Sequence, residues 1–244
     1  MPDDEDPLYF CVGTDGTMYF KGTEEPTCAA PQYAVVIGPH NQLPVANDAS
    51  AITNEDHTVT ITLSGSDADG DFLTFNTDPP ANGQLDPIVT TGRTTATVNY
   101  APKADFNGGD SFIYTVSDGN GGTDTATVSI TVNPVNDPPS FMGDNVTVNE
   151  DSGAGSFNGA TSISAGPADE DGQTVSFVVS NDNPALFSVQ PAISPSGTLT
   201  FTPKADAFGS ATVTVYLMDS GGIANGGDDT SPTQTFTITV TGVI

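Results

Sequence analysis

The chain has 244 residues, enough for two β domains of ordinary size or one large one. Only 4 lysines and arginines stand against 31 aspartates and glutamates, a net charge of −27, so charge alone excludes nucleic acid and anionic membranes as partners. No run of about eighteen apolar residues occurs, and the sequence therefore predicts no membrane insertion.

Residues 1–42 differ from the rest of the chain. Two β-prone runs, 8–12 and 18–21, flank the turn Thr14-Asp15-Gly16-Thr17. Asp-Gly between such runs is a strong hairpin signal, because both turn positions need a positive φ. A piece this small has too little core to stand alone, so we expect it to dock on the first repeat, a neighbouring copy or a larger assembly.

Cys11 and Cys28 are the only cysteines of the chain. A disulfide between them would close a short loop around the hairpin and stabilise it by roughly 3 kcal/mol. Two buried reduced thiols are the alternative, since the compartment is not known from the sequence.

Residues 43–135 form the first of two β-rich repeats. Its alternating runs are residues 58–63, 72–75, 96–100, 111–116 and 126–132. Such runs, separated by Gly, Asn, Asp and Pro turns, predict a sandwich of two antiparallel sheets. Residues 133–139 hold prolines at 134, 138 and 139 and predict a stiff, extended linker.

Residues 136–244 form the second repeat. Its strand candidates are residues 146–148, 175–179, 198–201, 211–216 and 235–240. The composition is rich in Thr, Val, Gly, Asn and Asp, which favours strands and turns over helices. The predicted fold class is all-β: two tandem sandwiches preceded by a small hairpin module.

An acidic pattern occurs twice, once in each repeat. The first copy reads Asn54-Glu55-Asp56, Asp67-Ala68-Asp69-Gly70-Asp71, Pro102-Lys103-Ala104-Asp105 and Asp118-Gly119. The second reads Asn149-Glu150-Asp151, Asp169-Glu170-Asp171-Gly172, Pro203-Lys204-Ala205-Asp206 and Asp219. Hard oxygen ligands clustered in loops are what Ca²⁺ selects, so the pattern predicts calcium sites. Ordinary turn chemistry is the alternative, because Asp caps its own backbone and tolerates a positive φ.

Together with Phe106-Asn107-Gly108 and Val135-Asn136-Asp137-Pro138-Pro139, these motifs resemble the tandem cadherin-like, immunoglobulin-like repeats of large bacterial surface proteins. Such repeats occur in adhesins, in proteins secreted with calcium-binding nonapeptide tails and in some phage structural proteins. The resemblance covers residues 43–244 and does not extend to residues 1–42. It implies cadherin-like sandwiches with Ca²⁺ at the junctions between them.

The resemblance also implies a set of calcium ligands at the junction of the two repeats. Mapped onto this sequence, these are Asn136, Asp137, Asp169, Asp171, Asp219 and Glu55, joined by Asp105 or Asp110. A second set would face the N-terminal piece: Asn47, Asp48, Asp67, Asp69, Asp71 and Asp118. With metal the two domains would become one rod, and without it the hinge would be free.

The match departs from the family pattern in the second repeat. Gln173 stands where the first repeat has Asp71, and Ser210 stands near the position of Asp110. No Asn-Asp-Pro linker follows the second repeat, so we expect Glu150 and Asp206 to have no third domain with which to share a metal.

The motifs do not predict an enzyme. His40 and His57 lack metal-ligand spacing, and no Gly-x-Ser-x-Gly elbow, phosphate loop or Cys–His pair occurs in the sequence. The leading hypothesis is a non-enzymatic structural or adhesive protein, a calcium-stiffened rod that projects from a bacterial cell surface or a virus particle and is therefore extracellular.

Two versions of this hypothesis stay open. As an adhesin fragment, the chain would be monomeric and contact a protein or polysaccharide surface. As a virion or filament decoration protein, it would bind a viral shell through residues 1–42 or self-associate as a homo-oligomer. The start methionine, the absence of an export signal and the missing onward linker favour the second version.

A carbohydrate-binding module of a secreted bacterial protein is the alternative function. Its stacking platforms would be Phe106, Phe141 and Phe208, expected in loops, and Tyr33. The glycine-rich residues 221–229 could serve as a recognition loop or form a long hairpin tip.

Overall fold

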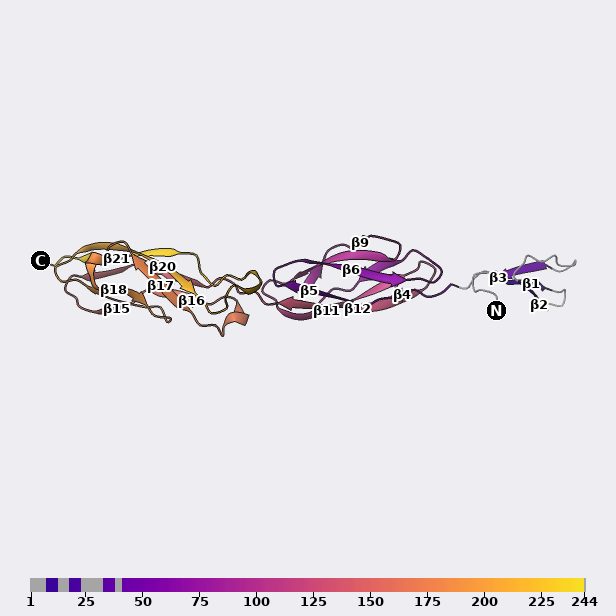
Figure 1. The fold of residues 1–244 in the computed structure, drawn as a ribbon, viewed down its shortest axis with the longest axis horizontal. Helices are drawn as coiled ribbons and strands as arrows, with labels where there is room; N and C mark the ends of the chain where they lie inside the picture. Colours follow the sequence, from indigo (N-terminus) through magenta and orange to yellow (C-terminus); the bar gives the residue numbers. More distant parts are fainter. Residues whose placement is uncertain (1–7, 13–17, 23–32, 38–40, 244) are drawn as a thin grey trace. The chain divides into compact units, whose positions relative to one another are not determined.

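The computed structural model describes residues 8–12, 18–22, 33–37 and 41–243 (Figure 1). The chain forms two compact units. The first unit comprises Met1–Ala51, Val59–Tyr100 and Asp110–Ile130, and the second comprises Ile52–Thr58, Ala101–Gly109 and Thr131–Ile244. Two end loops of the first repeat, residues 52–58 and 101–109, therefore pack in the second unit, together with the linker and the second repeat.

The N-terminal residues form a three-stranded sheet in the order β2-β1-β3, with β1 at Leu8–Val12, β2 at Met18–Gly22 and β3 at Tyr33–Ile37. β1 and β2 pair antiparallel, as expected for the two arms of the hairpin, whose turn lies outside the described residues. β3 was not predicted from the sequence, and it pairs antiparallel with β1 along its whole length.

Two sheets make up the first sandwich. One has the order β4-β6-β10-β8, with β9 also paired to β10, and the other has the order β5-β12-β11-β7. The bounds are β4 Val45–Ala46, β5 Ala49–Asn54, β6 Val59–Ser66, β7 Thr74–Thr77, β8 Gly83–Leu85, β9 Val89–Thr90, β10 Thr95–Pro102, β11 Gly108–Ser117 and β12 Thr123–Asn133. In β10, β11 and β12 every second side chain is buried, which is the period of a strand with one face on a core.

Buried Tyr100 and half-buried Asp110 form a polar pair in this sandwich. The Tyr100 hydroxyl donates to Asp110 Oδ2 at 2.9 Å, and the Asn82 backbone N–H donates to the same oxygen at 2.9 Å. Burial and this carboxylate raise the pKa of Tyr100. At the matching places the second repeat has Phe201 and Ala211, both buried in its core, so hydroxyl and carboxylate are absent together.

The pairing of Tyr100 with Asp110 leads to a prediction for the stability of the first sandwich. Asp110→Ala should cost about 1–3 kcal/mol of unfolding free energy, because it leaves the buried Tyr100 hydroxyl with a poor acceptor. The double variant Tyr100→Phe/Asp110→Ala should cost less than the sum of the single variants, and a double-mutant cycle by urea unfolding measures the difference. Additive costs would contradict the pairing.

The second sandwich has a four-stranded sheet, β14-β21-β20-β17, a three-stranded sheet, β15-β19-β18, and the pair β13-β16. The bounds are β13 Ser140–Gly143, β14 Val146–Asn149, β15 Gly155–Asn158, β16 Ala160–Ser164, β17 Ser176–Asn181, β18 Phe187–Ile193, β19 Thr198–Pro203, β20 Gly209–Met218 and β21 Gln234–Thr241. Three 3₁₀ turns lie in its loops: η1 Ala168–Glu170, η2 Pro184–Leu186 and η3 Ala224–Gly226. β14 runs parallel to β21, whereas the other described pairings of this sandwich are antiparallel.

The core of the second sandwich is apolar and aromatic. Phe201 contacts Phe157 with ring centroids 5.0 Å apart and Phe187 with centroids 5.5 Å apart. Phe141 of β13 is 3% exposed and meets Phe177 edge-on at 5.1 Å. The expectation that Phe141 lies in a loop is therefore wrong, because this residue closes the core. No helix among the described residues is long and apolar enough to cross a membrane.

Candidate metal centre

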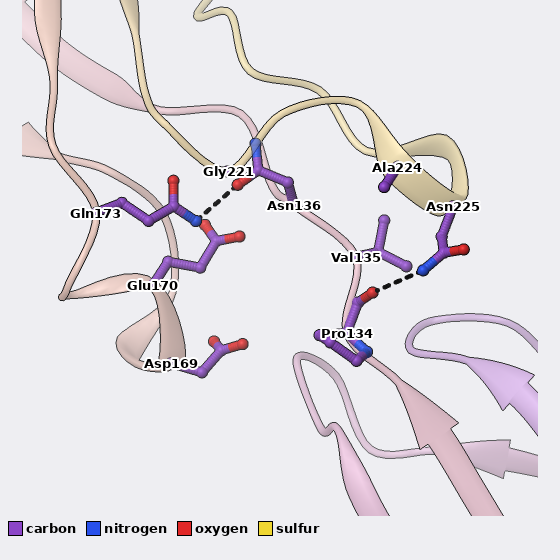
Figure 2. Close-up of a pocket in the computed structure, with 9 residues that line it drawn as sticks. All are labelled: Pro134, Val135, Asn136, Asp169, Glu170, Gln173, Gly221, Ala224 and Asn225. Atoms are coloured by element: carbon purple, nitrogen blue, oxygen red, sulfur yellow. Dashed lines mark hydrogen bonds between the residues drawn. The ribbon is translucent and has the colours of Figure 1, made fainter.

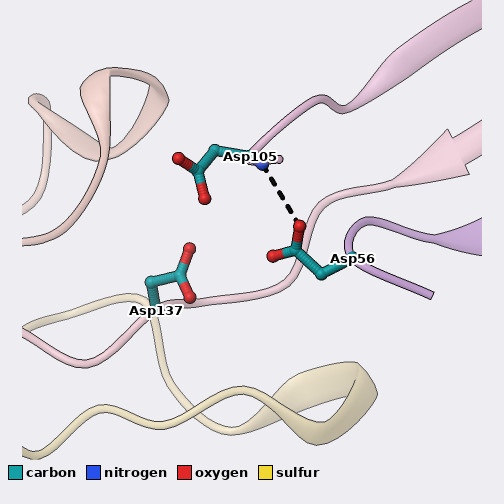
Figure 3. Close-up of side chains that lie close together, drawn as sticks. All are labelled: Asp56, Asp105 and Asp137. Carbon is teal, nitrogen blue, oxygen red and sulfur yellow. Dashed lines mark hydrogen bonds between the residues drawn. The ribbon is translucent and has the colours of Figure 1, made fainter. Parts of the chain in front are cut away.

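Three carboxylates from three segments meet in the second unit. Oxygens of Asp56, Asp105 and Asp137 lie within 4.8 Å of one another, and Figure 3 shows the three side chains directed toward a common space. Asp56 and Asp105 have positive φ angles of 57° and 56°, and the Asp105 backbone N–H donates to Asp56 Oδ1 at 3.3 Å. Like charges this close repel by about 1 kcal/mol per pair even in water, so a cation suits this space.

Glu55 and Asn107 connect this cluster to the linker. Glu55 is 2% exposed and accepts hydrogen bonds from the backbone N–H of Val135 and, at 3.5 Å, from Asn107 Nδ2. Asn107 Nδ2 also donates to Asp169 Oδ2 at 2.7 Å. The Glu55 backbone N–H donates to the Asn133 carbonyl at 3.0 Å. Loop 52–58, loop 101–109, the linker and the η1 turn therefore converge on one acidic centre.

Glu170 is a further acid of this centre, and it is 5% exposed. Its Oε1 accepts the backbone N–H of Asp137 at 2.9 Å, whereas its Oε2 is buried without a hydrogen-bond partner among the described residues. A buried carboxylate oxygen without a donor is costly, and a bound cation would satisfy it. The carboxylate oxygens of this centre thus fit a hard divalent cation.

A cavity of about 300 Å³ lies beside Glu170 (Figure 2). Its lining residues are Pro134, Val135, Asn136, Asp169, Glu170, Gln173, Gly221, Ala224 and Asn225. On one wall Gln173 Nε2 donates to Asn136 Oδ1 at 2.7 Å, and Asn136 Nδ2 donates to Asp219 Oδ1 at 3.0 Å. A Cβ at Gly221 would lie 1.6 Å from Asn136 Oδ1, so only glycine allows this approach.

The glycine-rich residues 221–229 pack on the linker. The Asp228 backbone N–H donates to the Asn136 carbonyl at 2.9 Å, and Asn225 Nδ2 donates to the Pro134 carbonyl at 3.4 Å. A Cβ at Gly227 would lie 2.9 Å from Asn136 N. The sequence left open whether these residues form a recognition loop or a long hairpin tip. Their contacts give them another role, which is to hold the linker.

Burial raises the pKa of Glu55, Asp137 and Glu170 above their ordinary values. Neighbouring carboxylates add to the effect: Asp105, Asp56 and Asp169 act on Asp137, and Asp137, Asp169 and Asp219 act on Glu170. Protonation of these carboxylates removes the cost of burying a charge and the repulsion from neighbouring carboxylates. These acids therefore hold protons at a higher pH than free ones do.

Calcium binding should therefore release protons. Lowering the pH through the raised pKa values of Glu55, Asp137 and Glu170 should weaken calcium binding, because protons then compete with the cation for these carboxylates. In EDTA the sign is opposite: acids with raised folded-state pKa values destabilise the fold when ionised, so the second unit should gain stability as the pH falls through those values. Calorimetry in buffers of different ionisation enthalpy counts the protons, and a pH-independent affinity would contradict the prediction.

The first unit holds a second acidic set. Oxygens of Asp67, Asp69 and Asp71 lie within 4.8 Å of one another. The backbone N–H groups of Asp69 and Asp71 both donate to Asp67 Oδ1, whereas the buried Asp67 Oδ2 has no hydrogen-bond partner among the described residues. Asp71 Oδ2 accepts from Asn120 Nδ2 at 2.7 Å, and Asp69 Oδ2 accepts the backbone N–H of Gln42 at 2.6 Å.

Asp118 adjoins this set through Asn120. Its Oδ2 accepts from Asn41 Nδ2 at 2.8 Å, and its Oδ1 accepts the backbone N–H groups of Asn120 and Gly122. The bond from Asn41 is the main reason that the pKa of Asp118 lies below its ordinary value, with burial acting in the opposite direction. Asp118 is therefore a fixed anion that already has partners.

Four expected ligands lie elsewhere or make structural bonds. The backbone of Asn47 exchanges hydrogen bonds with the Tyr114 hydroxyl, and Asp48 Oδ1 accepts the Thr127 backbone N–H at 2.8 Å. Asp110 belongs to the Tyr100 pair, so Asp105 is the one that joins the cluster. Asp171 is exposed at the end of η1.

Four members of the site were not predicted as such from the sequence: Asp56, Asn107, Glu170 and Gln173. Asp56 was visible in the Asn-Glu-Asp motif, but only its positive φ turns its carboxylate toward Asp105. Glu170 had a signal as well, since an acid stands there where the first repeat has Ala68.

Two other expectations concern the cysteines and the aromatic residues. Cys11 is buried and disulfide-bonded, and Cys28 lies outside the described residues. Of the proposed sugar platforms, Phe106 is half-buried, Phe208 is 71% exposed, and the side chain of Tyr33 lies outside the described part of the structure.

Solved structures with a similar fold include cadherin ectodomains. Human protocadherin-24 EC1-2 matches with a TM-score of 0.59 and 17% identity, covering 82% of this chain and 100% of that one, which shows a shared fold. The human desmocollin-1 ectodomain (TM-score 0.44, 13% identity, 98% of this chain and 55% of that one) and an endo-fucoidan hydrolase of glycoside hydrolase family 107 (TM-score 0.34, 18% identity, 100% and 38%) match more loosely, too loosely to carry an argument.

No curated protein matches the chain significantly. The family model described as "Bacterial Ig domain" matches residues 41–131 and again residues 136–241. The two matches together cover most of the chain, and both fall on the sandwiches. The chain therefore belongs to the bacterial Ig domain family, as two tandem Ig-like domains with the fold of cadherin ectodomains.

Proposed function

We propose that this chain is a non-enzymatic, calcium-stiffened structural or adhesive module displayed outside the cell, on a bacterial surface or on a virus particle. The observation that carries the proposal is the meeting of Asp56, Asp105 and Asp137, which come from two end loops and the linker. The match to the bacterial Ig domain family and the resemblance of the motifs to repeats of bacterial surface proteins support the location. Ca²⁺ is the cation that such oxygen ligands prefer.

Calcium would act here by tying the linker to the loops. Asp137 is a linker residue whose carboxylate belongs to the cluster and whose backbone N–H binds Glu170. Neutralising the cluster removes the repulsion among the three carboxylates and draws loops 52–58 and 101–109 onto the linker. A linker held at both its side chain and its backbone resists bending, which is what a projecting module requires.

The N-terminal sheet is proposed as the anchor in the version that decorates a virion or filament. Its support is a disulfide at buried Cys11 and a sequence unlike the Ig repeats. In the adhesin version the sandwiches themselves would contact a protein or polysaccharide surface. Binding of the purified chain to immobilised polysaccharides and to itself, each with and without residues 1–42, separates the versions.

Hydrogen exchange tests the calcium step. Backbone amides in residues 52–58 and 133–137 should exchange at least about tenfold more slowly in calcium than in EDTA, because the Val135 and Asp137 N–H groups are bonded to acids of the site. Strand β20, in the same unit, is the internal control and should not respond. Equal exchange in both conditions would overturn the proposal.

A further inference from the structure

A cavity of about 370 Å³ lies at one edge of the first sandwich. β7 and β8 are end strands of the two sheets, and the cavity is bounded by the end of β7, the loop that follows it and β8. Its lining residues are Thr77, Asp78, Pro79, Pro80, Gly83, Gln84 and Leu85. None of them belongs to either carboxylate cluster of the described chain, so the calcium sites do not account for this cavity.

The loop beside this cavity differs between the two repeats. It reads Pro80-Ala81-Asn82-Gly83 in the first and Pro184-Ala185-Leu186-Phe187 in the second. Leu186 and Phe187 are buried in the core of the second sandwich. Gly83 has no side chain, and it lines the cavity. The first repeat therefore lacks, in this loop, the two apolar side chains by which the second repeat joins loop to core.

Hydrogen bonds hold the loop of the first repeat instead. The backbone N–H of Asn82 donates to Asp110 Oδ2 at 2.9 Å, and the Tyr100 hydroxyl lies 3.4 Å from the Asn82 carbonyl oxygen. In the second repeat Phe201 stands at the position of Tyr100 and packs edge-on against Phe187 at 5.5 Å. Bonds to the backbone of Asn82 fix the loop without placing a side chain in the cavity, so the loop is anchored while the cavity keeps its volume.

The lining combines apolar surface with a few polar groups. Pro80 is buried and Leu85 is half-buried, whereas Thr77, Asp78 and Gln84 supply a hydroxyl, a carboxylate and an amide. Sites for small molecules have this mixture, and their volumes are usually about 300–1,000 Å³. No lining residue is basic and the chain carries a charge of −27, so an anionic ligand is disfavoured.

We infer that this cavity binds one neutral sugar unit, with the C–H face of the ring on Pro80 and Leu85 and the ring hydroxyls bonded to Thr77, Asp78 and Gln84. A sugar ring offers apolar C–H groups and hydroxyls together, which matches the lining. A purely apolar side chain of a partner would cover the carboxylate and the amide without giving them hydrogen bonds, which is costly. The inference goes beyond the proposed calcium function and does not depend on it.

Titration of the ¹⁵N-labelled full chain with sugars, followed by NMR, tests the inference. The probes are glucose, galactose, mannose, fucose and N-acetylglucosamine, with glucuronate as the anionic comparison. At least one neutral sugar should shift the backbone amides of Thr77, Asp78, Gly83, Gln84 and Leu85, with a dissociation constant of about 1–20 mM. Glucuronate should bind more weakly than glucose, because its charge repels Asp78. If no neutral sugar shifted these amides at concentrations up to about 100 mM, the inference would be overturned.

Two substitutions place the bound sugar in the cavity. Gly83→Phe introduces the residue that the second repeat has at this position, within strand β8, and should abolish the shifts by filling the cavity. Gln84→Ala changes an exposed side chain, so the fold is kept, and it should weaken binding about fivefold through the loss of one hydrogen bond.

Gln190→Ala is the matched control, because it removes an exposed glutamine from β18, the corresponding strand of the second sandwich. It should leave the affinity for the sugar unchanged. Equal affinity in the parent and in Gln84→Ala, or equal losses in Gln84→Ala and Gln190→Ala, would contradict the assignment. Either result leaves the calcium proposal as it stands, since the cavity contains none of the clustered carboxylates.

Discussion

Chelating calcium with EDTA should lower the melting temperature of this protein by roughly 10–20 °C. A ligand at 100 times its dissociation constant stabilises the folded state by about 2.7 kcal/mol, and a domain of about 100 residues shifts by about 4–8 °C per kcal/mol. The acids that cause the effect are in place: Glu55 and Glu170 are buried, and Asp137 lies against Asp56 and Asp105. Differential scanning calorimetry measures the shift between EDTA and a calcium concentration of about 100 times the dissociation constant.

Ionic strength is the control for this experiment. A chain with a net charge of −27 gains stability from any salt that screens its self-repulsion. Sodium chloride at matched ionic strength should reproduce only the part of the shift that comes from screening, which we expect to be small. If sodium chloride reproduced the whole shift in melting temperature, the acidic residues would serve only to form turns, and a specific calcium site would be refuted.

Asp137→Asn should weaken calcium binding in the second unit by roughly 100-fold, about 2.7 kcal/mol. Its carboxylate is the linker's contribution to the cluster, and the substitution removes a full negative ligand while the backbone N–H still binds Glu170. In EDTA the same variant should be slightly more stable than the parent, because one of three mutually repelling charges is gone.

Asp171→Asn is the comparison for that variant, because its exposed side chain lies outside both carboxylate clusters of the described chain. It should shift affinity by no more than about threefold, as expected for an exposed, screened charge. Equal losses in Asp137→Asn and Asp171→Asn would mean that general charge, not a coordinated ion, sets the affinity.

Strands with an unbroken alternation were predictable from the sequence, whereas strands without one were missed. The alternating runs at residues 96–100, 111–116 and 235–240 correspond to β10, β11 and β21, because one buried face imposes a period of two. β15 (Gly155–Asn158) has too few apolar residues to show that period. β18 (Phe187–Ile193) contains Pro191 and irregular register, so its pattern is broken.

The acidic centre was predictable in position but not in membership. Asp105 and Asp137 lie together as the repeat pattern implied, because the motif fixes which loops meet. Asp56 and Glu170 depend on local backbone geometry, a positive φ in one case and a 3₁₀ turn in the other. A sequence gives the loop, but a rotation of one residue decides which carboxylate faces inward.

Calcium titration of the chelator-treated full chain by isothermal titration calorimetry, at about pH 7 and about 0.15 M sodium chloride, tests for the calcium sites themselves. We predict saturable binding of at least two Ca²⁺ per chain with dissociation constants of about 1 mM or tighter, the range of extracellular calcium modules. No saturable binding up to about 10 mM calcium would contradict it.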